Sequence, residues 1–186
     1  MNKEDREASL APTLLVSMPQ MVDPNFSKTV VLLCEHSQDG AFGLVINRPS
    51  ETQAVEAIHL SPPPAHNSGM TLYVGGPVEP QRGWLLLGEA PDDAGAVRVA
   101  EGVYLSTSPL LLRRLIETGS PRARVLTGYA GWGAGQLDAE MAASAWLTAD
   151  VEVDLVFDVP AHQVWETAIR RLGADPALLQ MGHGVH

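Results

Sequence analysis

The apolar positions along the chain fall into short runs, and these runs predict a protein rich in strands. A run of β-branched and apolar residues at 28–36 predicts a strand covered on both faces, and residues 41–47 predict the strand that returns from it. The residues between them, SQDG at 37–40, are typical of a turn, so this pair is the clearest hairpin in the chain. We expect the remaining strands at residues 14–18, 71–76, 82–89, 97–108, 122–127 and 151–159.

Helical spacing of apolar residues is found mostly in the second half of the chain. For the segment at 109–119, Ser108 can act as the N-cap, Pro109 suits the first turn and Gly119 suits the end. Because strands outnumber helices and most helices come late, the pattern favours an α/β sandwich of the α+β type, with helices flanking a mixed, largely antiparallel sheet. The other expected helices are at residues 51–60 (capped by Ser50), 136–145, 164–172 and 175–181.

The length of 186 residues fits one domain, or one domain with a small appendage. No segment is a convincing linker, and the proline-rich loop at 61–69 is short enough to lie inside one domain. We therefore predict a flexible N-terminal tail at 1–12, one domain at 13–182, and a C-terminal tail at 183–186.

The composition predicts a folded cytoplasmic protein. Apolar residues make up 45% of the chain, which is enough for a core. Cys34 is the single cysteine and cannot form an internal disulfide, which indicates a reducing compartment. No apolar stretch approaches the roughly 18 residues that a membrane span needs, and the first residues lack the apolar region of a signal peptide. We therefore expect no membrane association.

The net charge of −10 argues against direct nucleic-acid binding, because neutralising phosphates requires clustered basic residues. The closest basic pairs, at 113–114 and 170–171, lie on the polar sides of predicted helices, where solvated charge is the simpler interpretation.

The hairpin carries the first candidate chemistry. If residues 37–40 form the loop, alternation places Cys34 and His36 on one face, beside small residues that leave room for a helix or for a groove. A thiol beside an imidazole suggests a nucleophile and its base, although residues two apart on a strand are about 7 Å apart at Cα. An inert buried thiol is the favoured interpretation. The expected cross-strand pairs are His36–Ala41, Glu35–Phe42 and Cys34–Gly43.

Motifs for metals, cofactors and hydrolysis are absent from the sequence. The histidines never form the H-x-x-x-H spacing that puts two imidazoles on one helix face, and one cysteine nearly excludes structural zinc. There is no G-x-S-x-G elbow and no Walker loop. We therefore predict no metal and no cofactor, and we expect the terminal His183 and His186 to belong to a tail.

A glycine-rich stretch, GYAGWGAGQLDAEM at 128–141, follows a predicted strand and precedes a helix. A phosphate could bind the free amides of such a helix, but Asp138 and Glu140 already place negative charge in its first turns. The favoured interpretation is that the glycines allow close packing, while Tyr129 and Trp132 form a wall of a shallow surface site.

Several of these blocks together resemble the bacterial YqgE/AlgH family. The resemblance rests on the long block at 18–49, on YVGGPV at 73–78, on RGW at 82–84, on the glycine-rich stretch with AWL at 145–147, and on GHG near the end. It covers almost the whole chain and implies a single-domain cytoplasmic α/β sandwich. The family name comes partly from a member linked to the regulation of alginate and virulence-factor production, and such members are often described as transcriptional regulators. The resemblance implies no particular enzymatic reaction. The acidic composition fits an indirect regulator better than a DNA-binding one.

The first hypothesis is a regulatory or binding protein that acts through a shallow, partly apolar cleft. Arg48 would hold an anionic group, Asn47 a neutral polar group, and Trp132 would supply apolar area. The partner is an unidentified protein or small molecule, and the protein itself is a monomer or a weak homo-oligomer. The expected cleft comprises Asp23, Pro24, Phe26, Glu35, His36, Asn47, Arg48, Gly75, Gly76, Pro77, Tyr129, Trp132 and Gln136.

The alternative hypothesis is an enzyme in which Glu35 and His36 perform acid–base chemistry on a small substrate that could be phosphorylated, with Arg48 stabilising negative charge. A third interpretation is purely structural. In it, Glu35 and Arg48 form a salt bridge that closes the hairpin, and His36 caps its turn.

Overall fold

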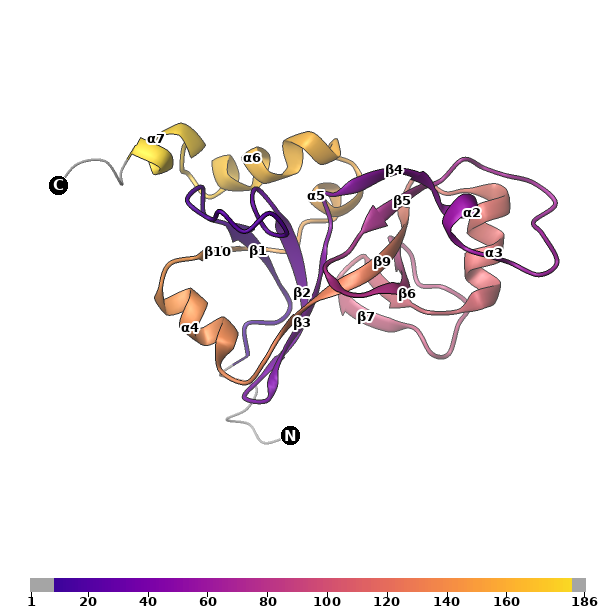
Figure 1. Ribbon diagram of the computed structural model, residues 1–186, viewed down its shortest axis with the longest axis horizontal. Helices are drawn as coiled ribbons and strands as arrows, with labels where there is room; N and C mark the ends of the chain where they lie inside the picture. The colour runs from indigo at the N-terminus through magenta and orange to yellow at the C-terminus, as the bar shows by residue number, and fades with distance from the viewer. Residues whose placement is uncertain (1–8, 182–186) are drawn as a thin grey trace.

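The computed structural model describes residues 9–181, and its strands join into one sheet (Figure 1). The strands are β1 (Thr13–Ser17), β2 (Val30–Ser37), β3 (Gly40–Val45), β4 (Pro49–Gln53), β5 (Thr71–Val74), β6 (Val78–Leu87), β7 (Val97–Ala100), β8 (Val103–Ser106), β9 (Ala123–Trp132) and β10 (Trp146–Ala149). The helices are α2 (Ala54–Ala57), α3 (Pro109–Thr118), α4 (Gln136–Ala142), α5 (Val153–Phe157), α6 (Ala161–Arg171) and α7 (Pro176–Met181).

The sheet confirms the predicted fold class. Its strand order is β10-β1-β2-β3-β9-β6-β8-β7, and β4 and β5 join it through β9. Every strand pair is antiparallel except β5 with β9, so the sheet is mixed and largely antiparallel. Helices flank both faces, as the sequence pattern predicts.

Strand β9 links two halves of the sheet. In its first half, Leu126 pairs with Tyr73 of β5 on one side and with Trp84 of β6 on the other. In its last residues, Gly131 pairs with Phe42 of β3. The chain that leaves β5 passes between β3 and β9, and Gly75 bonds to both. We call this point the glycine crossing.

The glycine crossing explains much of the glycine-rich sequence. A Cβ atom on Gly76 would lie 2.1 Å from the carbonyl carbon of Tyr129, and one on Gly128 would lie 2.2 Å from the carbonyl oxygen of Gly76. Gly128 also has a φ of +73°, which favours glycine. The packing interpretation of the glycine-rich stretch is confirmed for Gly128, whereas Gly76, expected in the cleft, packs at the same crossing. The predicted strand at 122–127 in fact continues to Trp132, because most of the stretch pairs within the sheet.

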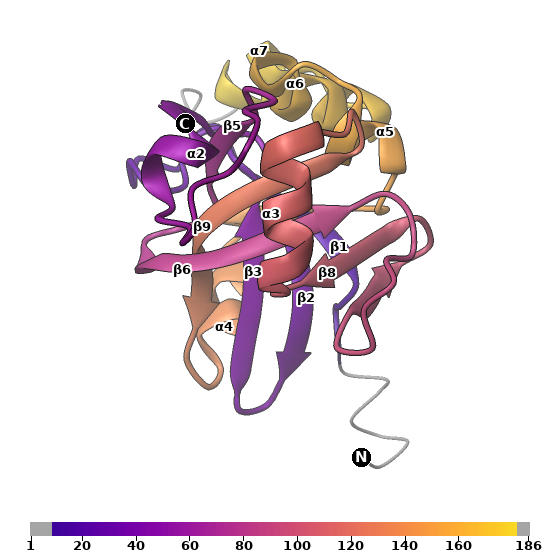
Figure 2. The same ribbon diagram turned by 90° about the vertical axis from the view of Figure 1, so that its right-hand side faces the viewer.

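Three core clusters hold the helices to the sheet. The first cluster lies between helices α5 and α6 and strands from both halves of the sheet. The second lies between α4 and the half that contains β1 to β3. The third lies between helices α2 and α3 and the half that contains β5 and β6. Figure 1 shows α6 and α4 on opposite sides of β1 and β10, and Figure 2 shows α3 lying across β6. None of the described helices combines the length and the apolar content that crossing a bilayer would need.

Two predicted elements differ from the structure. Residues 151–159, predicted as a strand, contain α5, because Glu152 and Asp154 at its start bind Arg171 of α6 and all of 155–157 is buried. The predicted helix at 51–60 is instead strand β4 followed by the single turn of α2. The hydroxyl of Ser50 donates to the Leu72 carbonyl of β5 and does not cap a helix.

Candidate functional site

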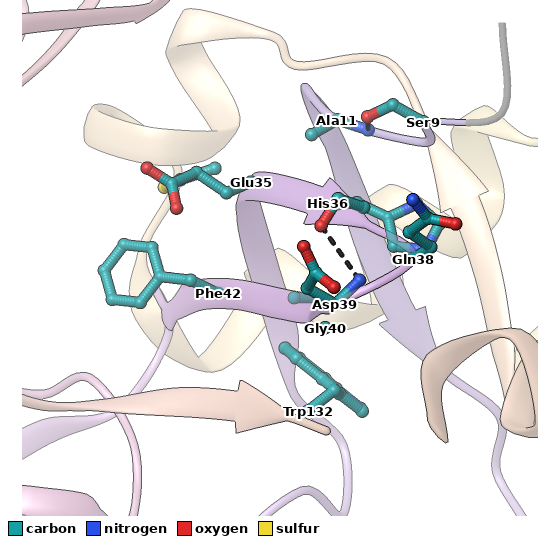
Figure 3. A pocket seen from close by; sticks show the side chains of 12 residues that line it. Ser9, Ala11, Glu35, His36, Gln38, Asp39, Gly40, Phe42 and Trp132 are labelled. Carbon is teal, nitrogen blue, oxygen red and sulfur yellow. Dashed lines mark hydrogen bonds between the residues drawn. The ribbon is translucent and has the colours of Figure 1, made fainter. Parts of the chain in front are cut away.

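The turn end of the β2–β3 hairpin carries a large pocket. Strand β1 begins at Thr13, opposite Leu33, so the last residues of β2 extend beyond it (Figure 2). Residues 9–11 lie beside this projecting part. They and the hairpin enclose a pocket of about 990 Å³ (Figure 3), which we call the hairpin pocket. Its lining residues are Ser9, Ala11, Cys34, Glu35, His36, Ser37, Gln38, Asp39, Gly40, Ala41, Phe42 and Trp132.

A β-bulge at Cys34 decides which side chains share a face. The predicted pairs His36–Ala41 and Glu35–Phe42 are confirmed, but Gly43 pairs with Leu33 and not with Cys34. The extra residue shifts the alternation of the strand by one position. Cys34 and Phe42 therefore pack against the first core cluster, while Ala41, opposite His36, packs against the second. The expectation that Cys34 and His36 share a face is wrong.

His36 connects three parts of the protein. Its Nδ1 accepts a hydrogen bond from the backbone N–H of Leu10 at 2.9 Å, and its Nε2 lies 3.3 Å from Oδ1 of Asp138 in α4. An Nδ1 that accepts carries no proton, so these partners assign the neutral Nε2–H tautomer. The side chain is only 4% exposed. His36 thus acts in this structure as a clamp on residues 9–12, which the sequence pattern assigned to a flexible tail.

Cys34 is a poor nucleophile in this setting. Burial, and secondly the negative charge of Glu35, raise the pKa of its thiol to about 12. The Sγ atom lies 3.5 Å from the carbonyl oxygen of Leu32. Because the thiolate is the reactive form, a thiol that stays protonated at neutral pH does not serve covalent catalysis.

Two exposed carboxylates give the hairpin pocket its character. Within residues 9–181, the carboxylates of Glu35 and Asp39 have no hydrogen bond or ion pair, although the backbone N–H of Asp39 donates to Ser37 (Figure 3). Phe42 and Trp132 add aromatic surface, and no lysine or arginine is among the described lining residues. The pocket is therefore acidic and partly aromatic.

Asn47 and Arg48 lie at the opposite end of β3 from the hairpin pocket. The Arg48 guanidinium donates to the carbonyls of Pro24 and Ser27 at 2.7 and 2.8 Å. The Asn47 side chain accepts from the N–H of Val30 and donates to the carbonyl of Lys28. Both side chains hold the loop before β2 in place. The expected salt bridge between Arg48 and Glu35 is not formed, because the two residues lie at opposite ends of the hairpin.

The other expected cleft residues have local structural roles. Asp23 accepts the N–H of Asn25 and so shapes its loop, whereas Phe26 packs against Trp132 and Trp146 with ring centroids 6.2 and 5.8 Å apart. Gln136 accepts the N–H of Gly133, and Gly75 to Pro77 belong to the glycine crossing. Tyr129 packs on Phe42, and a hydrogen bond with Glu79 raises the pKa of its hydroxyl.

The structure thus brings only part of the expected cleft into the hairpin pocket, namely Glu35, His36 and Trp132. The other lining residues were not in the expected cleft, namely Ser9, Ala11, Cys34, Ser37, Gln38, Asp39, Gly40, Ala41 and Phe42. The signal that could have found those of the hairpin was its polar turn followed by small residues, which left room for a groove. No signal pointed to residues 9–11, because their position depends on the clamp at His36.

A second pocket, of about 510 Å³, lies on the other half of the sheet beneath α2 and α3. Its lining includes the apolar side chains of Leu85 and Val125 and the polar side chains of His59 and Ser108. Among the residues that the structure describes, no three histidine, cysteine or acidic side chains are grouped so that they could hold a metal ion. His183 and His186 lie outside the described residues.

Comparisons with known proteins agree with this architecture. The AlgH-like family model matches residues 14–177. A UPF0301 protein of Magnetococcus marinus is 39% identical over 95% of this chain and 97% of its own length, and one of Myxococcus xanthus is 40% identical over 96% and 99%. The solution structure of the AlgH protein from Pseudomonas aeruginosa has a TM-score of 0.74 at 38% identity, covering 90% of this chain and 91% of that one. A crystal structure of a Corynebacterium diphtheriae protein shares the fold, with a TM-score of 0.72 at 24% identity, covering 92% of each chain. The chain therefore belongs to the AlgH-like family.

Proposed function

We propose that this protein is a regulatory binding protein, which takes a segment of a partner into the hairpin pocket. The observation that supports this proposal is a pocket of about 990 Å³ at a projecting turn, whose carboxylates at Glu35 and Asp39 are free of partners within residues 9–181. Polar groups without internal partners beside aromatic surface are typical of recognition sites. The regulatory effect then comes from sequestering or presenting that partner.

Direct contact with DNA does not belong to this proposal, because the net charge of −10 opposes a phosphate backbone. We propose that any control of transcription is indirect. We also propose a cytoplasmic location, since the single buried thiol fits a reducing compartment. The protein would act as a monomer or a weak homo-oligomer.

The enzyme alternative has less support. Glu35 and His36 point to opposite faces of the hairpin, and both ring nitrogens of His36 are occupied by Leu10 and Asp138. A general base needs a free nitrogen within reach of a substrate proton. The guanidinium of Arg48, which was to stabilise negative charge, is bound to two backbone carbonyls at the far end of β3.

The test is site-specific photo-crosslinking in cells. A photoreactive phenylalanine analogue replaces Gln38 in the hairpin pocket or, as the matched control, Gln163 of α6, which is also exposed. We expect a discrete partner to be crosslinked from position 38 and not from position 163. Binding of that partner, once purified, should be lost when Ser37→Trp fills the pocket. Equal crosslinking from both positions, or unchanged binding by Ser37→Trp, would contradict the proposal.

A further inference from the structure

We infer that the hairpin pocket recognises an arginine side chain of a partner protein. This inference rests on the proposed function and names the chemistry of the occupant. The pocket offers two carboxylates, Glu35 and Asp39, and neither has a hydrogen bond or ion pair within residues 9–181. An unpaired carboxylate at the rim of an aromatic pocket favours a cation and repels an anion.

The electrostatic surroundings of Glu35 support a cationic occupant. Its negative charge contributes, after burial, to the raised pKa of the neighbouring Cys34 thiol, and the described lining residues include no lysine or arginine. Asp138 adds a further negative charge at the clamp. His36 does not compensate these charges, because its Nδ1 accepts the Leu10 N–H and the ring is therefore neutral.

The protein contains an internal example of the proposed contact. The guanidinium of Arg82 lies over the ring of Trp84 at 4.6 Å, and its Nη1 reaches the carboxylate of Glu79 at 3.4 Å. Trp84 packs directly on Phe42, with ring centroids 5.0 Å apart. The ring of Trp84, which packs on Phe42, therefore already binds one guanidinium between its face and a carboxylate.

Glu35 and Phe42 bring a second carboxylate to the same cluster of rings, and no guanidinium of the described residues pairs with it. They are cross-strand partners, and Figure 3 shows their side chains extending together from the same side of the hairpin. A planar guanidinium can stack on the Phe42 ring while its N–H groups bond the Glu35 carboxylate in pairs. An ammonium group lacks both the plane and the paired donors, so arginine fits this arrangement better than lysine.

The experiment measures binding of matched dipeptide probes to the full chain. The probe is acetyl-Phe-Arg-amide, and the comparison probes carry lysine, glutamine or glutamate in place of arginine. Backbone amide shifts of the ¹⁵N-labelled protein report the position and the midpoint of each titration. We expect the arginine probe to shift residues 35–42 and to bind at least about fivefold more tightly than the glutamine probe.

Variants of the carboxylates complete the test. Glu35→Gln and Asp39→Asn should each weaken the arginine probe about three- to tenfold, whereas Asp92→Asn, in the exposed loop after β6, should leave it unchanged. Equal binding of the glutamine probe at residues 35–42 would overturn this inference and leave the binding function standing. Equal binding of the lysine probe would overturn the assignment to arginine. Absence of probe binding, with a partner still crosslinked from position 38, would also overturn the inference alone.

Discussion

Two buried tryptophans, Trp165 and Trp84, differ in whether the indole N–H has a hydrogen-bond acceptor. The Nε1 of Trp165 donates to the Ser17 carbonyl at 2.8 Å in the first core cluster. The Nε1 of Trp84 is also buried, and within residues 9–181 it has no hydrogen-bond partner. Replacing a tryptophan whose N–H is hydrogen-bonded removes that bond and leaves the acceptor carbonyl buried without a donor. Replacing a tryptophan whose N–H has no acceptor removes only packing contacts.

We therefore expect Trp165→Phe to lower the free energy of unfolding by about 1–3 kcal/mol more than Trp84→Phe does. Urea titrations of both variants followed by far-UV circular dichroism measure the difference. Both substitutions shorten a buried indole to a phenyl ring, so each serves as the control for the other. Equal losses would show that the hydrogen bond to Ser17 has no net value.

Cys34 gives a prediction about reactivity. Burial and the charge of Glu35 raise the pKa of its thiol to about 12, so the folded protein holds almost no thiolate at pH 8. Because the lower thiolate fraction outweighs the higher intrinsic nucleophilicity, iodoacetamide should modify Cys34 roughly 10- to 100-fold more slowly in the folded chain than in urea at the same pH. The rate should rise as the pH approaches the raised pKa. A folded-state rate equal to that of the denatured chain would refute the prediction.

At the level of elements, the glycine crossing sets the relation between β3, β5 and β9. Gly75 accepts the N–H of Val45 and donates to the carbonyl of Thr127, so one glycine bridges two strands. Gly76, with a φ of +153°, lies against the backbone of Tyr129. No side chain fits between these backbones, so the crossing requires glycine for steric reasons that strand propensity does not reflect.

We expect Gly76→Ala to cost more than about 3 kcal/mol of stability, because a Cβ atom 2.1 Å from backbone forces the strands apart in addition to straining φ. Gly83→Ala is the control, since a Cβ atom at that position of β6 meets no atom within 4 Å. Its cost should stay below about 1 kcal/mol. Thermal unfolding of the two variants distinguishes these outcomes, and similar midpoints would contradict the steric argument.

At the level of the whole molecule, the shared strand β9 and the first core cluster join the two sheet halves. That cluster combines Leu32 and Leu44 of one half with Leu86 and Leu126 of the other. Tight coupling of this kind favours all-or-none unfolding. The single domain predicted at 13–182 should therefore unfold in one transition.

We expect tryptophan fluorescence and far-UV circular dichroism to report one coincident unfolding transition in urea. Trp84 reports on the β6 half of the sheet, Trp132 and Trp146 on the second core cluster, and Trp165 on α6. Fluorescence thus samples both halves of the sheet and the first two core clusters. Two separated transitions would divide the chain into independently folding units and would contradict the single domain.

Local residue chemistry was sufficient to predict the hairpin, the helix α3 and the class of fold. A polar turn between two apolar runs set the pairs His36–Ala41 and Glu35–Phe42, and Ser108 with Pro109 marked the start of α3, because neighbours along the chain carry these signals. The same hairpin prediction placed Glu35 and His36 in the expected cleft, and both line the hairpin pocket.

The bulge at Cys34, the helix at 153–157, the glycine crossing and the clamp on Leu10 did not follow from local patterns. Alternation at 151–159 is typical of a strand, yet Arg171 from the next helix and burial of three consecutive residues make that segment helical. Arg48 looked free to bind an anion, yet two carbonyls from the loop before β2 occupy it. Each of these features depends on groups distant in sequence, whose hydrogen bonds and contacts exist only once the chain has folded and so leave no periodic pattern to read.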